Sequence, residues 1–336
     1  MYLLQKGETV KKTEAELLAA QWDPEHMETD PEVLERYVRY EVDPERSVAT
    51  IVFDRPDKMN ALPVAAFERI GDLVREAEVD DRVKVIVFRG EGDCFGTGAD
   101  AAELGHYIGY GTGKDGKSRT RPPQRTRILP DRNVLYNAFQ RPIEQCLKAT
   151  ICQVHGYCYG GHMQIALAAD IVIATPDSTY THPAFRYLGP GPQDMYLWIE
   201  NLGLKKMKDL MLTMRPLRAD EGEQCGFITR VVEADELEQW VADYAQAIAT
   251  MPIDSLMMGK SMMGMIMEMR GKSLGAMTCW IGHGWATNVV FEDGDWNFLR
   301  ERREKGIRVA LAEREEMVAP FFRLGHTRSG AKTDAG

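Results

Sequence analysis

The sequence predicts an α/β core followed by a helical C-terminal region, and three observations lead to this class. Between residues 48 and 175, short apolar runs rich in β-branched residues alternate with segments of helical periodicity. Two of these runs lead into turns rich in glycine. After residue 193 helical periodicity dominates, which is typical of helices that follow such a core.

We divide the chain into three regions. Residues 1–45 are polar and charged and form an N-terminal extension, with helical periodicity around 15–20 and 31–40. Residues 46–250 form the core, in which each predicted strand is followed by a turn or a helix. Residues 251–336 form a helical region with a C-terminal tail.

Each predicted element follows from its own pattern. The strands are apolar runs of four to six residues, at 48–53, 84–89, 151–154, 170–175 and 227–232. The helices show apolar residues at a period of 3.6, at 63–79, at 133–148, from His162 onward and from Gln193 onward.

Composition excludes several classes of protein. The chain has 336 residues, is 44% hydrophobic and carries a net charge of −10, which argues against nucleic acid as the main partner. No apolar run approaches the ~18 residues of a membrane span, and the N-terminus has no apolar stretch of signal-peptide length. The six cysteines contain no C-x-x-C motif, so we expect neither a disulfide framework nor a metal site, and a cytoplasmic location.

A long segment over residues 105–130 has little apolar periodicity and reads as a loop. It could act as a lid, recognise a carboxylate on a substrate or lie at a subunit interface, and a solvated loop is the alternative. Six basic residues give it a positive face: Lys114, Lys117, Arg119, Arg121, Arg125 and Arg127.

The most informative stretch is V-H-G-Y-C-Y-G-G-H-M-Q-I-A-L-A-A-D, residues 154–170. A strand runs into a glycine-rich turn that opens onto an apolar helix. A Gly-Gly pair at the start of a helix lets main-chain N–H groups approach a ligand closely, where the helix dipole also favours negative charge. The stretch therefore predicts a site for an anion or a developing oxyanion.

Four segments together resemble the crotonase (enoyl-CoA hydratase/isomerase) superfamily, in that family's order. They are A-T-I-V-F-D-R-P-D-K-M-N-A-L at 49–62, V-K-V-I-V-F-R-G-E-G-D-C-F-G-T-G-A-D at 83–100, the stretch 149–170 and R-A-D-E-G-E-Q-C-G-F-I-T-R-V-V at 218–232, with a weaker match to the family's closing helix at 302–314. The resemblance implies a spiral of ββα turns followed by helices that build trimers, commonly paired into hexamers.

The resemblance also implies a substrate and a site. Members of the family bind acyl-CoA thioesters and stabilise an enolate-like oxyanion with two main-chain N–H groups, which by residue match would belong to Ala99 and Gly161. It implies no separate cofactor, because coenzyme A arrives as part of the substrate. The positions matching the CoA site are Lys58, Ala61, Leu62, Thr97, Gly98, Asp100 and Lys260, although a solvated surface charge is the alternative for the two lysines.

The chain departs from the hydratases at both of their catalytic glutamates. The first position is Gln164, and the second is Ala184, or Phe185 if a one-residue insertion is placed differently. Glutamine cannot transfer a proton at neutral pH, although it can orient a water molecule. Ordinary two-glutamate hydration is therefore not expected.

The loop that would face the acyl group offers other groups. We expect His182 to act as the base with Asp194 orienting it, while Gln164 orients the reacting water. The alternatives are a turn-stabilising histidine for His182 and a helix N-terminal charge for Asp194. Tyr187 could hydrogen-bond the acyl end or simply pack, and His162 could point into the core or into the pocket.

Three functions stay open at this point. The first is an acyl-CoA enzyme that adds water or cleaves a C–C bond or ring of a cyclic, aromatic or carboxylated acyl-CoA, with isomerisation and decarboxylation as further reactions. The second is a CoA-independent C–C hydrolase acting on a β-diketone. The third is a binding subunit without catalysis. The methionine cluster 257–269 indicates adaptable packing or the interface of a homotrimer or a dimer of trimers.

Overall fold

The computed structural model describes residues 2–5, 8–11, 27–101, 103, 125–187, 194–286 and 291–321. The helical periodicity around residues 15–20 and most of the predicted loop 105–130 lie outside the described residues. The last part of that loop is helical, since α4 spans Arg125–Pro130.

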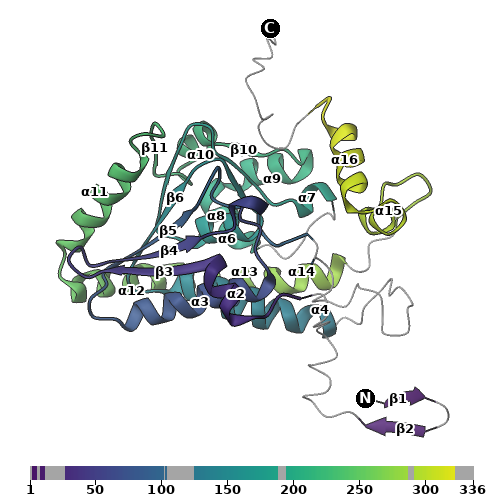
Figure 1. Cartoon of the computed structure of the whole chain (residues 1–336), viewed down its shortest axis with the longest axis horizontal. Coiled ribbons are helices and arrows are strands. Elements are labelled where there is room, and N and C mark those ends of the chain that lie inside the picture. Colours follow the sequence, from purple (N-terminus) through teal and green to yellow (C-terminus); the bar gives the residue numbers. More distant parts are fainter. Residues whose placement is uncertain are drawn as a thin grey trace.

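A six-stranded sheet forms the centre of the molecule, in the order β11-β8-β6-β5-β4-β3 (Figure 1). All neighbouring strands run parallel except β3, which pairs antiparallel with β4. The predicted strands are confirmed, and their bounds are β4 Val48–Phe53, β5 Val85–Gly90, β6 Ala149–Val154, β8 Ile171–Ala174 and β11 Arg230–Val231.

The edge strand β3 corrects the sequence prediction for the N-terminal extension. The helix predicted over residues 31–40 ends early, because α2 spans Pro31–Tyr37 and β3 spans Val38–Asp43. In β3, Val38 is buried, and Tyr40 and Val42 pack against the core, so the segment follows a period of two from Val38 onward and not the predicted helical period. The strand belongs to the central sheet, although it lies before the predicted core boundary.

A second sheet of three very short strands was not predicted. It has the order β10-β9-β7, with β7 spanning Tyr157–Tyr159, β9 Thr179–Thr181 and β10 Leu217–Arg218. Strands of two or three residues carry too little periodicity to be found in the sequence. The sheet fixes the start of helix α6, Gly161–Ala168, because the Gly160 N–H donates to the Thr181 carbonyl at 2.9 Å.

Helices cover both faces of the central sheet. On one face α3, Val64–Val79, packs with α6 in the main apolar core, and on the other face α11, Leu237–Ala249, packs on β5, β6 and β8. The helix predicted over 133–148 is part of a continuous helical run made of α4, the π-helix η2 at Asp131–Gln140 and α5 at Arg141–Gln145.

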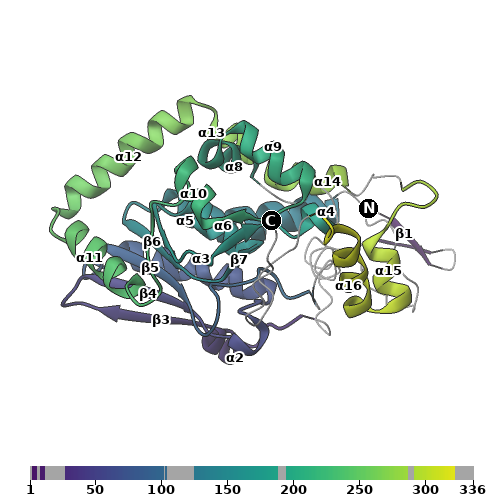
Figure 2. The same ribbon diagram turned by 90° about the horizontal axis from the view of Figure 1, so that it is seen from above.

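The remaining elements are short or lie towards the C-terminus. They are β1 Tyr2–Gln5, β2 Glu8–Lys11, η1 Pro56–Lys58, α7 Ala184–Tyr187, α8 Met195–Leu202, α9 Leu204–Thr213, α10 Ala219–Cys225, α12 Ile253–Met269, α13 Lys272–Ala276, α14 Thr278–Ala286, α15 Phe298–Lys305 and α16 Ile307–Val318. Helices α12 and α16 lie towards opposite ends of the molecule (Figure 2). None of the described helices combines the length and apolar character that a bilayer crossing requires.

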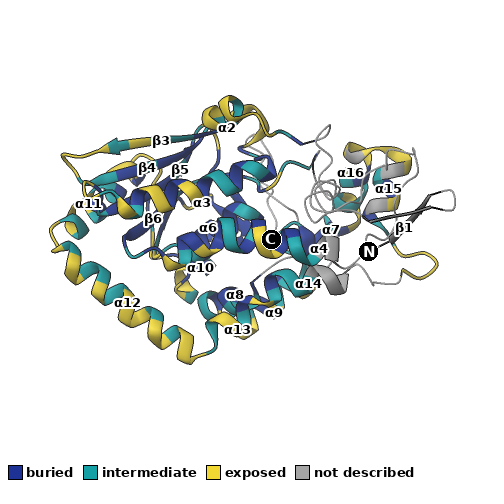
Figure 3. Ribbon diagram, turned by 90° about the horizontal axis from the view of Figure 1, so that it is seen from below, coloured by how far each residue is buried: buried dark blue, intermediate teal, exposed yellow. Residues whose placement is uncertain are grey.

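Helix α12 contains no buried residue over its 17 residues (Figure 3). One side of it presents a stripe of exposed apolar side chains, made of Met258, Met262, Met265, Ile266 and Met269. A surface stripe of this kind is typical of a protein–protein interface, and flexible methionines pack well against an irregular partner surface.

We predict that this stripe is covered in a homotrimer or a dimer of trimers. Replacing Met262 and Met265 together by glutamate should shift the assembly to smaller species in light scattering, because two charges would then be buried in the interface. The matched control is glutamate at Met251, an exposed residue just before α12. A wild-type protein that is monomeric at micromolar concentration would contradict the prediction.

Candidate active site

Two glycine turns meet at one edge of the central sheet. The first follows β5 and the second follows β6 and β7, and the carboxyl ends of parallel neighbours lie at the same edge. A Cβ atom added to Gly98 would lie 3.0 Å from the Tyr159 carbonyl oxygen and 3.2 Å from the Gly161 nitrogen. Gly98 has a φ of +92° and Gly160 a φ of +57°, so both positions need glycine for backbone conformation as well as for space.

The backbone around Ala99 leaves its N–H unused. Leu62 pairs with Ala99 in an isolated parallel bridge. In this bridge the Leu62 N–H donates to the Gly98 carbonyl, and the Leu62 carbonyl accepts the Asp100 N–H. The bridge therefore uses the groups on either side of Ala99, and the N–H of Ala99 itself points to the other side of the chain. Neither the Ala99 N–H nor the Gly161 N–H donates a hydrogen bond to any described residue.

Gly161 is the first residue of α6, where backbone N–H groups have no partner within the helix and the dipole is positive. Two unpaired donors thus lie on two main-chain segments in direct contact. This arrangement can bind an anion or a charge that develops during a reaction.

His162 points into the core, which decides between the two orientations that the sequence left open. Its ring is fully buried among Phe53, Phe67 and Phe95, and its Nδ1 atom accepts the N–H of Gly98 at 3.0 Å. Burial lowers the pKa of His162 to about 3. The ring is therefore neutral at physiological pH.

The segments expected to hold coenzyme A lie together beside these turns. The Thr97 hydroxyl donates to the Met59 carbonyl at 3.1 Å, and Leu62 is bridged to Ala99. Lys58 is exposed at the end of η1, and the Ala61 N–H donates to its carbonyl oxygen. The structure thus brings together the two segments that contain the expected CoA-binding residues. These residues are Lys58, Ala61, Leu62, Thr97, Gly98 and Asp100.

Two residues that hold this region together were not singled out in the sequence. Asn60 is fully buried, and its amide donates to the carbonyls of Glu91 and Cys94 while its side-chain oxygen accepts the Arg55 N–H. Arg55 donates to the Asp100 carboxylate at 2.7 Å and to the Ala61 carbonyl at 2.8 Å. The signal was the R-P-D-K-M-N turn itself, whose Asn60 adopts a left-handed φ of +54°.

Within the single chain, Lys260 lies apart from the other residues expected to bind coenzyme A. Its ammonium group pairs with Asp170 at 2.5 Å and donates to the Lys148 carbonyl at 2.8 Å. Lys148 and Asp170 immediately precede β6 and β8, whereas the glycine turns follow the opposite ends of the parallel strands. Helix α12 therefore carries Lys260 to the other edge of the sheet.

Neither hydratase glutamate position carries a carboxylate in the folded protein. Gln164 is buried in the first turns of α6, and its N–H donates to the Gly160 carbonyl at 3.1 Å. Ala184 and Phe185 are both buried in α7. Placing the insertion differently does not change this result.

The expected His182–Asp194 pair does not form. Asp194 is the N-cap of α8, where one carboxylate oxygen accepts the N–H groups of Tyr196 and Leu197 and the other accepts the Gln140 amide at 2.9 Å. The His182 Nδ1 accepts the Ala184 N–H at 3.2 Å. The helix-cap alternative for Asp194 is the one present, because the sequence shows the residue before a helix but not which group its side chain meets.

Tyr187 instead meets a carboxylate that sequence reasoning missed. Its hydroxyl donates to Glu315 at 2.6 Å, and the second oxygen of Glu315 pairs with the buried guanidinium of Arg186 at 2.5 Å. Burial and the hydrogen bond to Glu315 raise the pKa of Tyr187, so the phenol is neutral. Glu315 lies on α16, which packs against α7 (Figure 1). It follows directly after the closing-helix match at 302–314.

Helix α7, which carries Arg186 and Tyr187, begins close to the second glycine turn. The Tyr187 N–H donates to the Pro183 carbonyl at 3.1 Å, and Pro183 packs beside Gly160, since a Cβ at Gly160 would lie 3.7 Å from its ring. A neutral phenol, a carboxylate and a guanidinium can together donate, accept and orient a proton.

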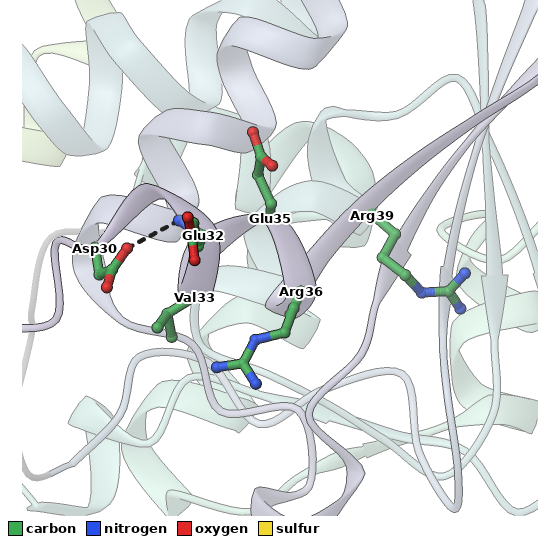
Figure 4. Close-up of a pocket in the computed structure, with 6 residues that line it drawn as sticks. All are labelled: Asp30, Glu32, Val33, Glu35, Arg36 and Arg39. Carbon is green, nitrogen blue, oxygen red and sulfur yellow. Dashed lines mark hydrogen bonds between the residues drawn. The ribbon is translucent and has the colours of Figure 1, made fainter.

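A surface depression elsewhere does not share these residues. It lies on α2 and the start of β3 (Figure 4), and its lining is Asp30, Glu32, Val33, Glu35, Arg36 and Arg39. Five of these six side chains are charged, so the depression does not suit an apolar acyl group. The Glu32 N–H donates to Asp30 there as an ordinary helix cap.

Comparison with known proteins agrees with this fold. A sequence profile described as enoyl-CoA hydratase/isomerase matches residues 43–276. A putative enoyl-CoA hydratase, EchA13, of Mycobacterium tuberculosis is 25% identical over 261 residues, which cover 74% of this chain and 79% of that protein. A 4-chlorobenzoyl coenzyme A dehalogenase of an Arthrobacter species is 28% identical over 208 residues, covering 61% and 70%. The crystal structure of an enoyl-CoA hydratase from Mycobacterium smegmatis has a TM-score of 0.70 at 26% identity and covers 84% of this chain and 94% of its own.

The fold and the similarities define the class as the crotonase superfamily, as the sequence predicted. Within it, the chain belongs to the enoyl-CoA hydratase/isomerase family and is an acyl-CoA enzyme of that superfamily.

A buried polar cluster connects η2 and α5 to the start of α8 and to the C-terminal helix α13. Glu144 is almost completely buried beside Gln140, which also binds Asp194, and the Lys272 ammonium lies 3.3 Å from one oxygen of Glu144. Desolvation outweighs the attraction of Lys272 and raises the pKa of Glu144 from 4.5 to about 7. The cluster joins α5, α8 and α13, so it holds the cap of α8 against the C-terminal region.

We predict that Glu144 makes the stability of the protein depend on pH. The folded state keeps a proton on Glu144 that the unfolded state releases above its ordinary pKa of 4.5. The free energy of unfolding should therefore fall as pH rises from 4.5 through 7, by up to about 3 kcal/mol. Glu144→Gln should remove most of this slope when denaturant unfolding is measured at pH 5 and pH 8. An unchanged slope in Glu144→Gln, with the exposed Glu76→Gln as control, would refute this assignment.

Proposed function

We propose that this protein adds water to, or hydrolytically cleaves a C–C bond or ring of, a cyclic, aromatic or carboxylated acyl-CoA. The observation that carries the proposal is the pair of N–H groups of Ala99 and Gly161, which lie on two glycine turns in contact and donate to no residue in the described part of the chain. A thioester carbonyl bound between them would gain two hydrogen bonds as its oxygen becomes negative.

The energetic role of such donors is well defined. Donors that are fixed before the reaction need no reorganisation when charge develops, and each is typically worth about 3 kcal/mol of barrier. The start of α6 adds the positive end of the helix dipole to the same point. Main-chain donors also fit a site in which the neighbouring side chains differ from those of a simple hydratase.

The reaction is distinguished from ordinary hydration by its missing carboxylates. Gln164 and Ala184 occupy the two glutamate positions, so a water molecule cannot be held between two carboxylates there. The matched relatives themselves carry different names, enoyl-CoA hydratase and 4-chlorobenzoyl coenzyme A dehalogenase, which supports a scaffold that serves more than one acyl-CoA reaction. The positive charges within 105–130 are our reason for including a carboxylated acyl group.

We assign the proton transfers to Tyr187 and Glu315, with Gln164 orienting the water. In an addition, the water oxygen bonds to the β-carbon, the C=C electrons move to the thioester oxygen, and the proton of the water passes to Glu315. The protonated carboxyl then returns a proton through the Tyr187 phenol to the α-carbon. Arg186 holds the Glu315 carboxylate in place, because its guanidinium pairs with the second carboxylate oxygen.

The substrate would be held by main-chain groups between Lys58 and Leu62 and between Thr97 and Asp100, with coenzyme A as part of the substrate and no separate cofactor. Lys260 has no part in this site in our proposal, since Asp170 and the Lys148 carbonyl already bind it. We further propose a cytoplasmic enzyme that works as a homotrimer or a dimer of trimers.

The proposal is tested with a panel of enoyl-, aryl- and cyclic β-keto-acyl-CoA thioesters read by mass spectrometry. Addition of one water to at least one thioester is the expected result, and calorimetry should detect binding of free coenzyme A. Turnover of a free β-diketone without coenzyme A binding would favour the CoA-independent hydrolase. Thioester binding without any mass change would favour a binding subunit.

Gly161→Pro should abolish turnover because proline lacks the N–H donor. Gly161→Ala is its matched control, since a Cβ at this position meets the Phe67 ring at 2.5 Å in either variant but only proline removes the donor. We expect the proline variant to be slower than the alanine variant by ~10²-fold in kcat. Equal kcat values for the two variants would exclude Gly161 as a donor.

The acid–base assignment gives a separate prediction. Tyr187→Phe and Glu315→Gln should each lower kcat by ~10²-fold, the usual scale for a positioned acid or base. Asp194→Asn should leave kcat within a few-fold of wild type, because asparagine also caps a helix. Gln164→Glu should not improve the native reaction. If Tyr187→Phe is fully active and His182→Ala is inactive, the assignment to Tyr187 and Glu315 is wrong and His182 is the base.

A further inference from the structure

We infer that His162 is a positioning residue that holds the two oxyanion donors in a fixed relation to each other. The inference rests on the proposed oxyanion function of Ala99 and Gly161 and adds the residue that joins them. His162 follows Gly161 directly in the chain, and its side chain reaches across to the other glycine turn, where its Nδ1 accepts the Gly98 N–H at 3.0 Å. One residue therefore contacts both halves of the site.

The contact matters because Gly98 has no side chain to restrict its rotation. Its φ of +92° lies in a region where glycine has wide freedom, so hydrogen bonds must hold the two peptide groups beside it. The Leu62 N–H holds the Gly98 carbonyl at 2.9 Å, and this carbonyl shares a peptide group with the Ala99 N–H. His162 holds the preceding peptide group. Because the peptide groups on both sides of Gly98 are fixed, the Ala99 N–H points in a single direction.

The ring itself is held tightly enough to serve as a support. Phe53, Phe67 and Phe95 lie edge-on to it, with ring centroids 4.7 to 5.8 Å away. A Cβ added to Gly96 would lie 2.3 Å from the ring, so the glycine of the first turn leaves the space that the imidazole fills. Gly96 and His162 are therefore matched to each other across the two turns.

The chemistry of the ring suits a permanent acceptor. An imidazole accepts at Nδ1 only when that nitrogen carries no proton, which leaves the proton on Nε2. Burial lowers the pKa of His162 to about 3, so the accepting form persists through the physiological range. A histidine that only filled the core would not need this tautomer, and an apolar side chain could replace it without loss at the oxyanion site.

The test uses acetoacetyl-CoA, whose enolate absorbs in the near ultraviolet and resembles the charge that the donors would stabilise. Wild-type protein should raise the enolate fraction of the bound thioester. His162→Leu, which removes the acceptor, should reduce that enolate enrichment by ~10-fold, since misdirected donors lose much of their effect. His162→Asn, which keeps an acceptor near the position of Nδ1, should retain most of it, and the dissociation constant should change little in either variant.

The outcomes separate this inference from the proposed function. No enolate enrichment by wild-type protein would overturn the oxyanion function, and the role of His162 with it. Enrichment in wild type that His162→Leu fully retains would overturn the role of His162 alone. If His162→Leu does not fold, nitrogen-15 NMR of the wild-type ring decides. A proton on Nδ1 overturns the inference, whereas an unprotonated Nδ1 coupled to the Gly98 N–H between pH 5 and 9 supports it.

Discussion

The close approach of two main-chain segments, Gly96–Ala99 and Tyr159–Gly161, is the constraint around which this molecule is built. Only glycine allows the approach, since a side chain at Gly98 would meet the Gly161 nitrogen and one at Gly161 would meet Phe67. The central sheet brings the two segments to one edge. The small sheet β10-β9-β7 fixes the position of Gly160, because the Gly160 N–H donates to the carbonyl of Thr181 in β9. The surrounding core holds these two segments against each other, and among the described residues neither the Ala99 N–H nor the Gly161 N–H has a hydrogen-bond acceptor.

The chemistry around these donors has been rearranged relative to a two-glutamate hydratase. The carboxylates are absent from Gln164 and Ala184, while Glu315 arrives from α16 and meets Tyr187 and Arg186. A carboxylate supplied by the C-terminal helix links the proposed chemistry to the docking of that helix. The same region is tied to the core from another side, through Lys272, Glu144, Gln140 and the Asp194 cap. In the proposed function the helical region contributes to the site through Glu315, in addition to its predicted role in assembly.

Two buried acidic residues show how hydrogen-bond partners, rather than residue type, set a role. Asp194 accepts three hydrogen bonds as a helix cap, which satisfies the carboxylate and leaves it no position from which to serve as partner to His182. Glu144 lies beside it with fewer donors, and its pKa is raised to about 7. A sequence shows both as acidic residues near helices, but their partners come from η2, α8 and α13, far apart along the chain.

The sequence by itself determined the family, the strands β4, β5, β6 and β8, the glycine turns and the absence of both hydratase glutamates, because local periodicity or ordered motifs show each of them. It could not determine that residues 38–43 form a strand and not a helix. It also could not determine the three strands of two or three residues, or the partners of Asp194 and Lys260. Only the tertiary structure decided that His162 faces Gly98 and that Glu315 meets Tyr187. The reason is physical. The partners in these two pairs lie 64 and 128 positions apart in the chain, so their contact depends on how the helices and strands pack. Local sequence periodicity contains no information about such contacts.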